Sequence, residues 1–162
     1  NFIAANNAND IFYNYLLSGI YSPKASIQTI ANAMDVGDPS NFARILDLYK
    51  SSHAEICNHI SGATYSDDEI AATMKKCYEQ TGYVLDPHGA CGYQALKDNL
   101  KEGETGVFLE TAHPAKFKEK VDAILSTDIE IPTRLADFMK GKKQSLEMAA
   151  DFSAFKQFLL SV

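Results

Sequence analysis

The chain has 162 residues, of which 46% are hydrophobic and 22% are charged, a composition typical of one soluble globular domain. Fifteen Lys and Arg against 21 Asp and Glu give a net charge of −6, which argues against nucleic acid or an anionic membrane as a partner. The three cysteines lack CxxC spacing and suggest neither a disulfide framework nor a zinc site, so a reducing, cytoplasmic setting fits best.

The N-terminal region predicts a strand, a helix and a long loop. Phe2–Ala4 is a short apolar run, and the Asn and Asp residues within 6–10 are expected to cap a helix that starts at Ile11. Residues 22–38 mix Pro, Gly and Asn with a brief helical pattern. We interpret them as a partly ordered loop, a kind of segment that often carries function.

The middle of the chain predicts two helices in succession. A helix over 42–60 has an apolar face and ends at Gly62. Ser66 and Glu69 have the spacing of a capping box, and the helix that they begin ends at Gly82.

Two further strands are each followed directly by a helix. Residues 83–85 predict the second strand, after which Asp86 caps a helix and Pro87 starts it. Residues 107–109 predict a third strand buried on both faces, and Pro114 begins the next helix.

This alternation predicts an α/β fold. We expect three layers, with a small, mostly parallel sheet of about three strands flanked by helices. We assign residues 1–125 to this α/β fold. Residues 126–162 form a C-terminal helical tail, with a helix from Pro132 to about Met139 and a last helix from Phe152 to Val162, which we expect to pack on the same domain.

Polar residues collect at the three strand-to-helix junctions, which in a parallel sheet meet at the carboxyl edge where ligands bind. They are Asn7, Asn9 and Asp10 after the first strand, His88 after the second, and Thr111 and His113 after the third. Each has a structural alternative. Asn and Asp cap helices, threonine is common at a strand end, and histidine satisfies backbone groups at a helix start.

Other reactive residue types give no site. His53 and His59 lie on one predicted helix without companion ligands, so we assign no metal. Cys91 lies close to His88 on an early helical turn, but no third residue orients the pair as nucleophilic catalysis requires. We therefore assign no catalytic residue within this chain.

The sequence contains three distinctive groups of residues in order. They are FIAANNAND, SPKAS and NAMDVGDPSNF between Phe2 and Phe42, DPHGACGYQAL from Asp86 to Leu96, and TAHPAKF from Thr111 to Phe117. Their order and spacing resemble the threonine synthases of the bacterial and fungal branch. These are pyridoxal phosphate enzymes of fold type II that convert O-phosphohomoserine and water to threonine and phosphate. The similarity fades beyond Leu125.

The resemblance implies roles for the junction residues. In the family, a hydroxyl at the position of Thr111 hydrogen-bonds the pyridine nitrogen of the cofactor, and the other junction residues are candidates for substrate binding: Asn7, Asn9, Asp10, His88 and His113. Gly89 departs from relatives that carry a hydroxyl residue there, so no hydroxyl contact is expected at that position.

The resemblance also implies that essential parts lie elsewhere. The family forms its internal Schiff base on a lysine in an earlier domain and holds the cofactor phosphate in a Gly- and Asn-rich loop. The sequence shows neither feature, and Lys116 is not taken for that lysine. We expect a C-terminal fragment that is inactive alone, does not bind pyridoxal phosphate alone, and requires the N-terminal portion of the same chain.

Two alternatives remain open from the sequence. The chain could be a free-standing α/β scaffold or interaction module, or part of a related pyridoxal phosphate enzyme that acts on another amino acid.

Overall fold

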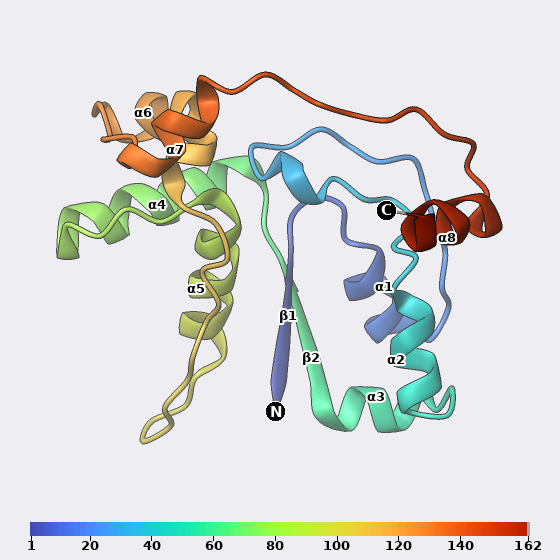
Figure 1. Ribbon diagram of the computed structural model, residues 1–162. Helices are drawn as coiled ribbons and strands as arrows, with labels where there is room; N and C mark the ends of the chain where they lie inside the picture. The colour runs from blue at the N-terminus through green and yellow to red at the C-terminus, as the bar shows by residue number, and fades with distance from the viewer. Residues whose placement is uncertain (162) are drawn as a thin grey trace. The chain divides into compact units, whose positions relative to one another are not determined.

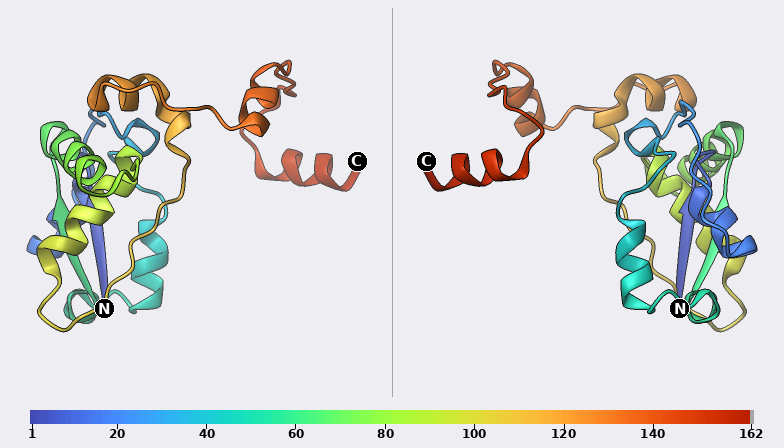
Figure 2. Two further views of the ribbon diagram at one scale, coloured as in Figure 1. Left: turned by 90° about the vertical axis from the view of Figure 1, so that its left-hand side faces the viewer. Right: turned by 90° about the vertical axis from the view of Figure 1, so that its right-hand side faces the viewer.

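The computed structural model describes residues 1–161, so Val162, predicted to lie in the last helix, is outside the described range. The chain divides into two compact units, Asn1–Glu130 and Ile131–Val162. The first unit is built on two parallel strands, β1 (Phe2–Asn6) and β2 (Ile60–Thr64), paired in register from one end to the other (Figure 1). The strands lie side by side in all views (Figure 2).

Helices cover both sides of this sheet (Figure 1). On one side lie α1 (Ile11–Ser18), α2 (Phe42–Leu48) and α3 (His53–His59), and on the other α4 (Asp67–Thr81) and α5 (Pro87–Asn99), with α6 (Lys118–Leu125) packed on α4. Two short 3-10 helices, η1 (Asn32–Met34) and η2 (Pro114–Phe117), complete the unit. The predicted α/β class, with a small parallel sheet between helices, is confirmed.

Each side of the sheet has its own apolar core. On the side of α4, Met74 and Val121 are completely buried. On the side of α1, Tyr15, Phe42 and Ile56 are buried together, and the rings of Tyr15 and Phe42 meet edge to face with centroids 4.7 Å apart. Because the sheet is narrow, these helix contacts rather than strand pairing supply most of the buried apolar surface.

The prediction of one helix over 42–60 was wrong. The chain forms two helices there, separated by a left-handed turn in which Lys50 and Ser51 have φ angles of 51° and 58°. Ser52 then caps α3, since its side chain accepts a hydrogen bond from the backbone N–H of Glu55 at 3.3 Å. The apolar spacing of two short helices in succession resembled that of one longer helix.

Gly62 lies inside β2 and does not end a helix as predicted. A Cβ atom at this position would lie 2.9 Å from Leu16 Cδ1 and 3.0 Å from Tyr13 Cδ2 of α1. Glycine therefore allows α1 to approach the sheet closely, which is one of the reasons for glycine within a strand.

Two of the three predicted strands are irregular in the structure. Residues 83–85 and 107–109 form no backbone ladder within 1–161. A strand requires a neighbour for its N–H and C=O groups, and these two segments have none there. Leu85 is buried as expected, whereas Val107 and Leu109 are exposed, at 84% and 77%, within these residues.

The local signals for the start of the following helices are confirmed. Asp86 is the N-cap of α5, where its side chain accepts from the backbone N–H of His88 at 2.8 Å, and Pro87 is the first helical residue. Pro114 starts η2, which continues into α6.

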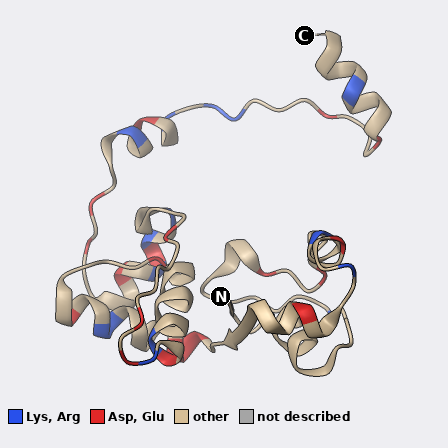
Figure 3. Cartoon of the chain, turned by 90° about the horizontal axis from the view of Figure 1, so that it is seen from below, with Lys and Arg blue, Asp and Glu red and all other residues tan. Residues whose placement is uncertain are grey.

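The second unit contains α7 (Thr133–Met139) and α8 (Phe152–Ser161), close to the predicted ranges. That this tail packs on the first unit stays a prediction. In residues 1–161 no helix has the length and apolar character needed to cross a membrane. Within the first unit, Lys and Arg are interspersed with Asp and Glu (Figure 3).

Candidate functional site

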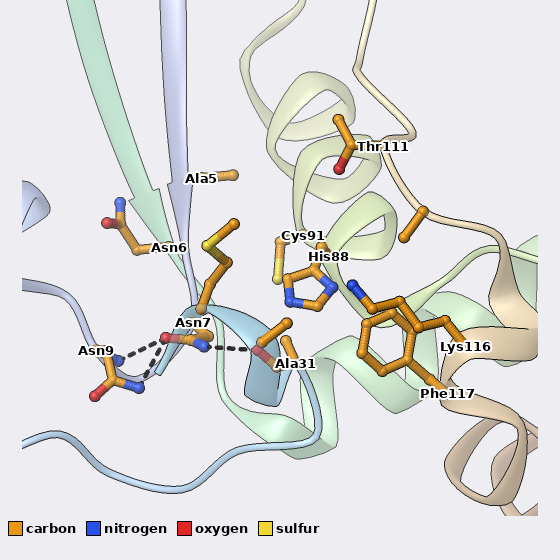
Figure 4. A pocket seen from close by; sticks show the side chains of 13 residues that line it. Ala5, Asn6, Asn7, Asn9, Ala31, His88, Cys91, Thr111, Lys116 and Phe117 are labelled. Carbon is orange, nitrogen blue, oxygen red and sulfur yellow. Dashed lines mark hydrogen bonds between the residues drawn. The ribbon is translucent and has the colours of Figure 1, made fainter. Parts of the chain in front are cut away.

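A pocket of about 430 Å³ lies where the three predicted junctions come together (Figure 4). We call it the junction pocket. It is lined by the end of β1 and the residues after it (Ala5, Asn6, Asn7, Asn9), by the loop around η1 (Ala31, Ala33, Met34), by the start of α5 (His88, Cys91), and by the third junction (Thr111, Ala112, Lys116, Phe117).

Four of the six predicted site residues line this pocket: Asn7, Asn9, His88 and Thr111. They come from segments more than 100 residues apart in the sequence. Thr111 lies across the pocket from Asn7 (Figure 4), and its hydroxyl has no hydrogen-bond partner within 1–161. The junctions therefore converge even though two of the three expected strands do not form.

Asp10 and His113 do not line the pocket. Asp10 occupies the N-cap position of α1 but makes no side-chain cap; its carboxylate instead accepts from Lys24 Nζ at 2.7 Å. Burial would raise the pKa of Asp10, but hydrogen bonds, chiefly from Lys24, outweigh it, and the pKa is lowered. His113 is exposed, and its Nδ1 accepts from the backbone N–H of Ala115 at 3.1 Å, which caps η2.

The Asn7 and Asn9 amides are held in a polar network that fixes the pocket wall. Asn7 Oδ1 accepts from the Asn9 backbone N–H at 2.8 Å, and both side-chain amides donate to Asp35 Oδ1 at 3.1 Å. Asn9 also bonds both backbone groups of Ile27, at 2.7 and 2.8 Å. The capping role that we considered for these residues is not what the structure shows. They tie residues 27–35 to the end of β1.

His88 is oriented by a buried acid. Its Nδ1 lies 2.9 Å from Oδ1 of Asp86, whose side chain is fully buried, and its ring stands against Phe117 with centroids 5.0 Å apart. Burial would raise the pKa of Asp86, but hydrogen bonds from His88 and Glu110 outweigh it and lower the pKa. Since an ionised carboxylate can only accept hydrogen bonds, Nδ1 of His88 is the donor to Asp86.

Glu110 completes this arrangement from the third junction. Its Oε1 accepts from the Asp86 backbone N–H at 2.8 Å. Burial, together with the neighbouring Asp86 carboxylate, raises the pKa of Glu110 to about 7. Glu110 therefore connects residues 106–111 to the start of α5, at the residue that orients the pocket-lining His88.

The remaining pocket residues set its electrostatics. Lys116 supplies an ammonium group, and no Asp or Glu is among the pocket-lining residues that the structure describes. Cys91 also lines the pocket, but its thiol is buried and donates to the Pro87 carbonyl at 3.4 Å. Burial raises the pKa of Cys91 to about 12, which disfavours the reactive thiolate. The pocket suits an anionic ligand.

Sequence reasoning missed Lys116, Glu110 and Asp35 as parts of this site. Glu110 immediately precedes Thr111, so its position at the junction was a usable signal. Asp35 bonds residues more than 20 positions away, and Lys116 sits in the first turn of a helix, where a solvated side chain is the ordinary interpretation. No local sequence pattern distinguishes Asp35 and Lys116 from ordinary surface residues.

Two protein-family models match the chain. The model for pyridoxal-phosphate dependent enzymes matches residues 1–111, and the model for the C-terminal region of threonine synthase matches residues 89–159. The first covers more than half of the chain and includes β1, α5 and Thr111.

Curated relatives are similar over nearly the whole chain. It is 43% identical over 159 residues to threonine synthase of Haemophilus influenzae, covering 98% of this chain and 37% of the relative. It is 40% identical over 160 residues to threonine synthase of Escherichia coli, covering 99% and 37%. The chain thus spans little more than a third of the length of these relatives.

Solved structures give the same result. The threonine synthase of Escherichia coli superposes with a TM-score of 0.81 at 39% identity, over 99% of this chain and 37% of that one. Threonine synthase of Brucella melitensis with bound pyridoxal phosphate has a TM-score of 0.78 at 28% identity, over 97% and 39%. The chain belongs to the pyridoxal-phosphate dependent enzymes and, within them, corresponds to the C-terminal part of threonine synthases.

Proposed function

We propose that this chain forms one wall of the active-site cleft of a threonine synthase that converts O-phospho-L-homoserine and water to L-threonine and phosphate. The observation that carries the proposal is the junction pocket, which Thr111, His88 and Lys116 all line. No Asp or Glu is among its described lining residues. Such a lining favours a ligand with anionic groups, and the substrate carries both a phosphate and a carboxylate.

The residues present fit pyridoxal phosphate. The Thr111 hydroxyl lines the pocket without a partner in 1–161, and a hydroxyl can donate to a pyridine nitrogen or accept from it. Thr111 would hold the ring by this contact without the charge that a carboxylate would bring. When bound, pyridoxal phosphate supplies the electron sink for the reaction.

The other pocket residues divide into two roles. We propose that His88 and Lys116 bind the polar and anionic groups of the substrate. The Asn7 and Asn9 amides are already engaged by Asp35 and by each other, so we propose that they shape the wall. We assign Asp10 and His113 no direct contact, since neither lines the pocket.

The remaining functional groups are proposed to come from protein outside this chain. Because the chain covers 37% of its relatives, we propose that the cofactor lysine and the phosphate-binding loop belong to the part that it does not cover. That N-terminal portion would be its partner, and the chain alone would be inactive. The three free cysteines fit the cytoplasm as its setting.

The test uses a full-length threonine synthase that carries this chain as its C-terminal part. Thr111→Val removes the hydroxyl at nearly constant volume, and Thr111→Ser keeps it. We expect kcat for O-phosphohomoserine to fall roughly 10- to 100-fold in the valine variant, as the loss of a hydrogen bond to a charged or polarised group implies. The serine variant should stay within a few-fold.

Thr105→Val provides the control, because Thr105 is an exposed threonine of the same segment that does not line the junction pocket. It should leave kcat unchanged. Equal losses in the two valine variants would contradict the role of Thr111. Turnover of another amino acid without turnover of O-phosphohomoserine would show a related enzyme instead. Binding of pyridoxal phosphate by the chain alone, measured by absorbance, would contradict its dependence on the N-terminal portion.

A further inference from the structure

The carboxyl groups of Asp86, which contacts His88, and of Glu110, which contacts the Asp86 backbone, do not line the junction pocket. The backbone N–H of Asp86 donates to Glu110 Oε1 at 2.8 Å, and the second oxygen of each carboxyl group, Asp86 Oδ2 and Glu110 Oε2, is buried without a hydrogen-bond partner in the described residues. Two carboxyl groups form a hydrogen bond only when one of them carries a proton. Two neighbouring carboxylates repel each other, and each buried oxygen without a partner adds a desolvation cost, so the arrangement favours one proton on the pair.

The surroundings assign that proton to Glu110. Asp86 accepts from the backbone N–H of His88 at 2.8 Å and lies 2.9 Å from its Nδ1, and it caps α5, so its ionised form is favoured. Glu110 accepts only from the Asp86 backbone. Besides His88, Tyr83 interacts with both carboxyl groups and Cys91 with Asp86, and neither brings a positive charge.

The position of Glu110 depends on a glycine. A Cβ atom at Gly89 would lie 2.1 Å from Glu110 Oε2 and 2.5 Å from its carboxyl carbon, so any side chain there would force the carboxyl group out of its present position. At Gly92, one turn later in α5, the nearest atom to an added Cβ is Phe108 Cβ at 3.6 Å, an ordinary contact. The two glycines therefore differ sharply in what they permit.

We propose that Glu110 is a positioning residue of the junction pocket. Its protonated carboxyl group donates to Asp86 Oδ2 and holds the Asp86 carboxylate against Nδ1 of His88, which keeps the imidazole in one orientation at the pocket wall. Glu110 touches neither substrate nor cofactor and acts through Asp86. The effect on catalysis rests on the proposed function, whereas the shared proton does not.

The first experiment detects the proton in the full-length protein without substrate. Difference infrared spectroscopy with carbon-13 glutamate separates the C=O stretch of a neutral glutamic acid from other bands. We expect such a band at pH 6, its loss as pH rises through about 7, and its absence from the Glu110→Gln variant. If the band is missing from the unsubstituted protein, or unchanged in Glu110→Gln, the proposal is overturned.

The second experiment tests the positioning role. Glu110→Ala and Gly89→Ala should each lower kcat/KM roughly 10- to 100-fold, since a misplaced group near the reaction centre costs about this much. The double variant should be no worse than either single one, because both remove the same contact. Glu110→Gln, whose amide can both donate and accept, should recover most of the loss, and Gly92→Ala is the control.

The outcomes separate the two proposals. Additive losses in the double variant, or failure of glutamine to recover activity, would overturn the positioning role even if Thr111 behaves as expected. An infrared band in a protein that does not turn over O-phosphohomoserine would leave the carboxyl pair established and contradict only the proposed function. Melting temperatures of all variants identify those that lose activity by unfolding.

Discussion

The Asp35 carboxylate accepts a hydrogen bond from the side-chain amide of Asn7 at 3.1 Å, across 28 positions of sequence. The same carboxylate accepts from the Asn9 amide at 3.1 Å and from the hydroxyl and backbone N–H of Thr29 at 2.7 and 3.0 Å. One side chain therefore fixes the loop of residues 27–35 to the end of β1. This loop supplies one side of the junction pocket.

Replacing Asp35 should loosen this loop. Asp35→Ala leaves several partly buried donors without an acceptor, and we expect the free energy of unfolding to fall by about 2–4 kcal/mol. Asp38→Ala is the matched control, since Asp38 is exposed and accepts from only one side chain, the Tyr21 hydroxyl at 2.8 Å. Urea unfolding measures both, and amide hydrogen exchange should rise over 26–35 in the Asp35 variant alone. Equal destabilisation by the two variants would contradict the network.

Gly37 should tolerate no side chain. An added Cβ would lie 1.8 Å from the Lys24 carbonyl oxygen and 2.9 Å from the Ser26 backbone nitrogen, and backbone atoms cannot rotate away. We expect Gly37→Ala to destabilise the protein by at least about 2–3 kcal/mol, the upper range for overpacking. Gly92→Ala, where the space is sufficient, should cost little. Thermal unfolding of both variants tests this, and similar melting temperatures for Gly37→Ala and Gly92→Ala would contradict the prediction.

The capping box of α4 should be sensitive to pH. Ser66 and Glu69 exchange hydrogen bonds, with the Glu69 carboxylate accepting from the Ser66 backbone N–H at 2.8 Å and from its hydroxyl at 2.7 Å. The backbone hydrogen bond, followed by that of the hydroxyl, lowers the pKa of Glu69 below the ordinary 4.5. A lowered pKa contributes stability that is present above pH 4.5 and is lost as pH falls through the folded value.

Glu69→Gln keeps an acceptor but removes the charge, so it should reduce the unfolding free energy at neutral pH by about 0.3–1 kcal/mol, and by less in acid. Urea titrations at pH 7 and pH 3 measure the difference. A variant that loses the same amount at both values would show that the charge of Glu69 does not matter.

Local signals were enough to predict the boundaries of α4 and the start of α5. The Ser66 and Glu69 capping box is present, Gly82 ends α4 with a φ of 71°, and Asp86 with Pro87 begins α5. Each of these signals acts within four residues, so the sequence contains the whole interaction. The junctions also come together as expected, since Thr111 and His88 line the same pocket, while their binding of a ligand stays a prediction.

Strands were predicted poorly because they depend on distant partners. Residues 60–64 are a strand because β1 lies beside them, although their sequence ISGAT contains a glycine and little apolar alternation. Residues 107–109 are apolar enough for a strand but have no neighbour within 1–161. The same reason explains why Asp35 was missed, since its role comes from contacts with residues more than 20 positions away.

The carboxyl pair should give the protein a distinctive pH dependence of stability. Burial raises the pKa of Glu110 from 4.5 to about 7, so between these values the folded state holds a proton that the unfolded state has lost. The stability that this group contributes is complete below about pH 4.5 and is lost as pH rises to about 7.

Glu110→Gln cannot titrate, so the advantage of wild type over the variant should be larger at pH 5 than at pH 8. Urea midpoints at the two pH values measure it, with the exposed Glu79→Gln as control. A wild-type advantage that stays constant or grows with pH would show that Glu110 is ionised, and two facing carboxylates could not hold Asp86 against His88.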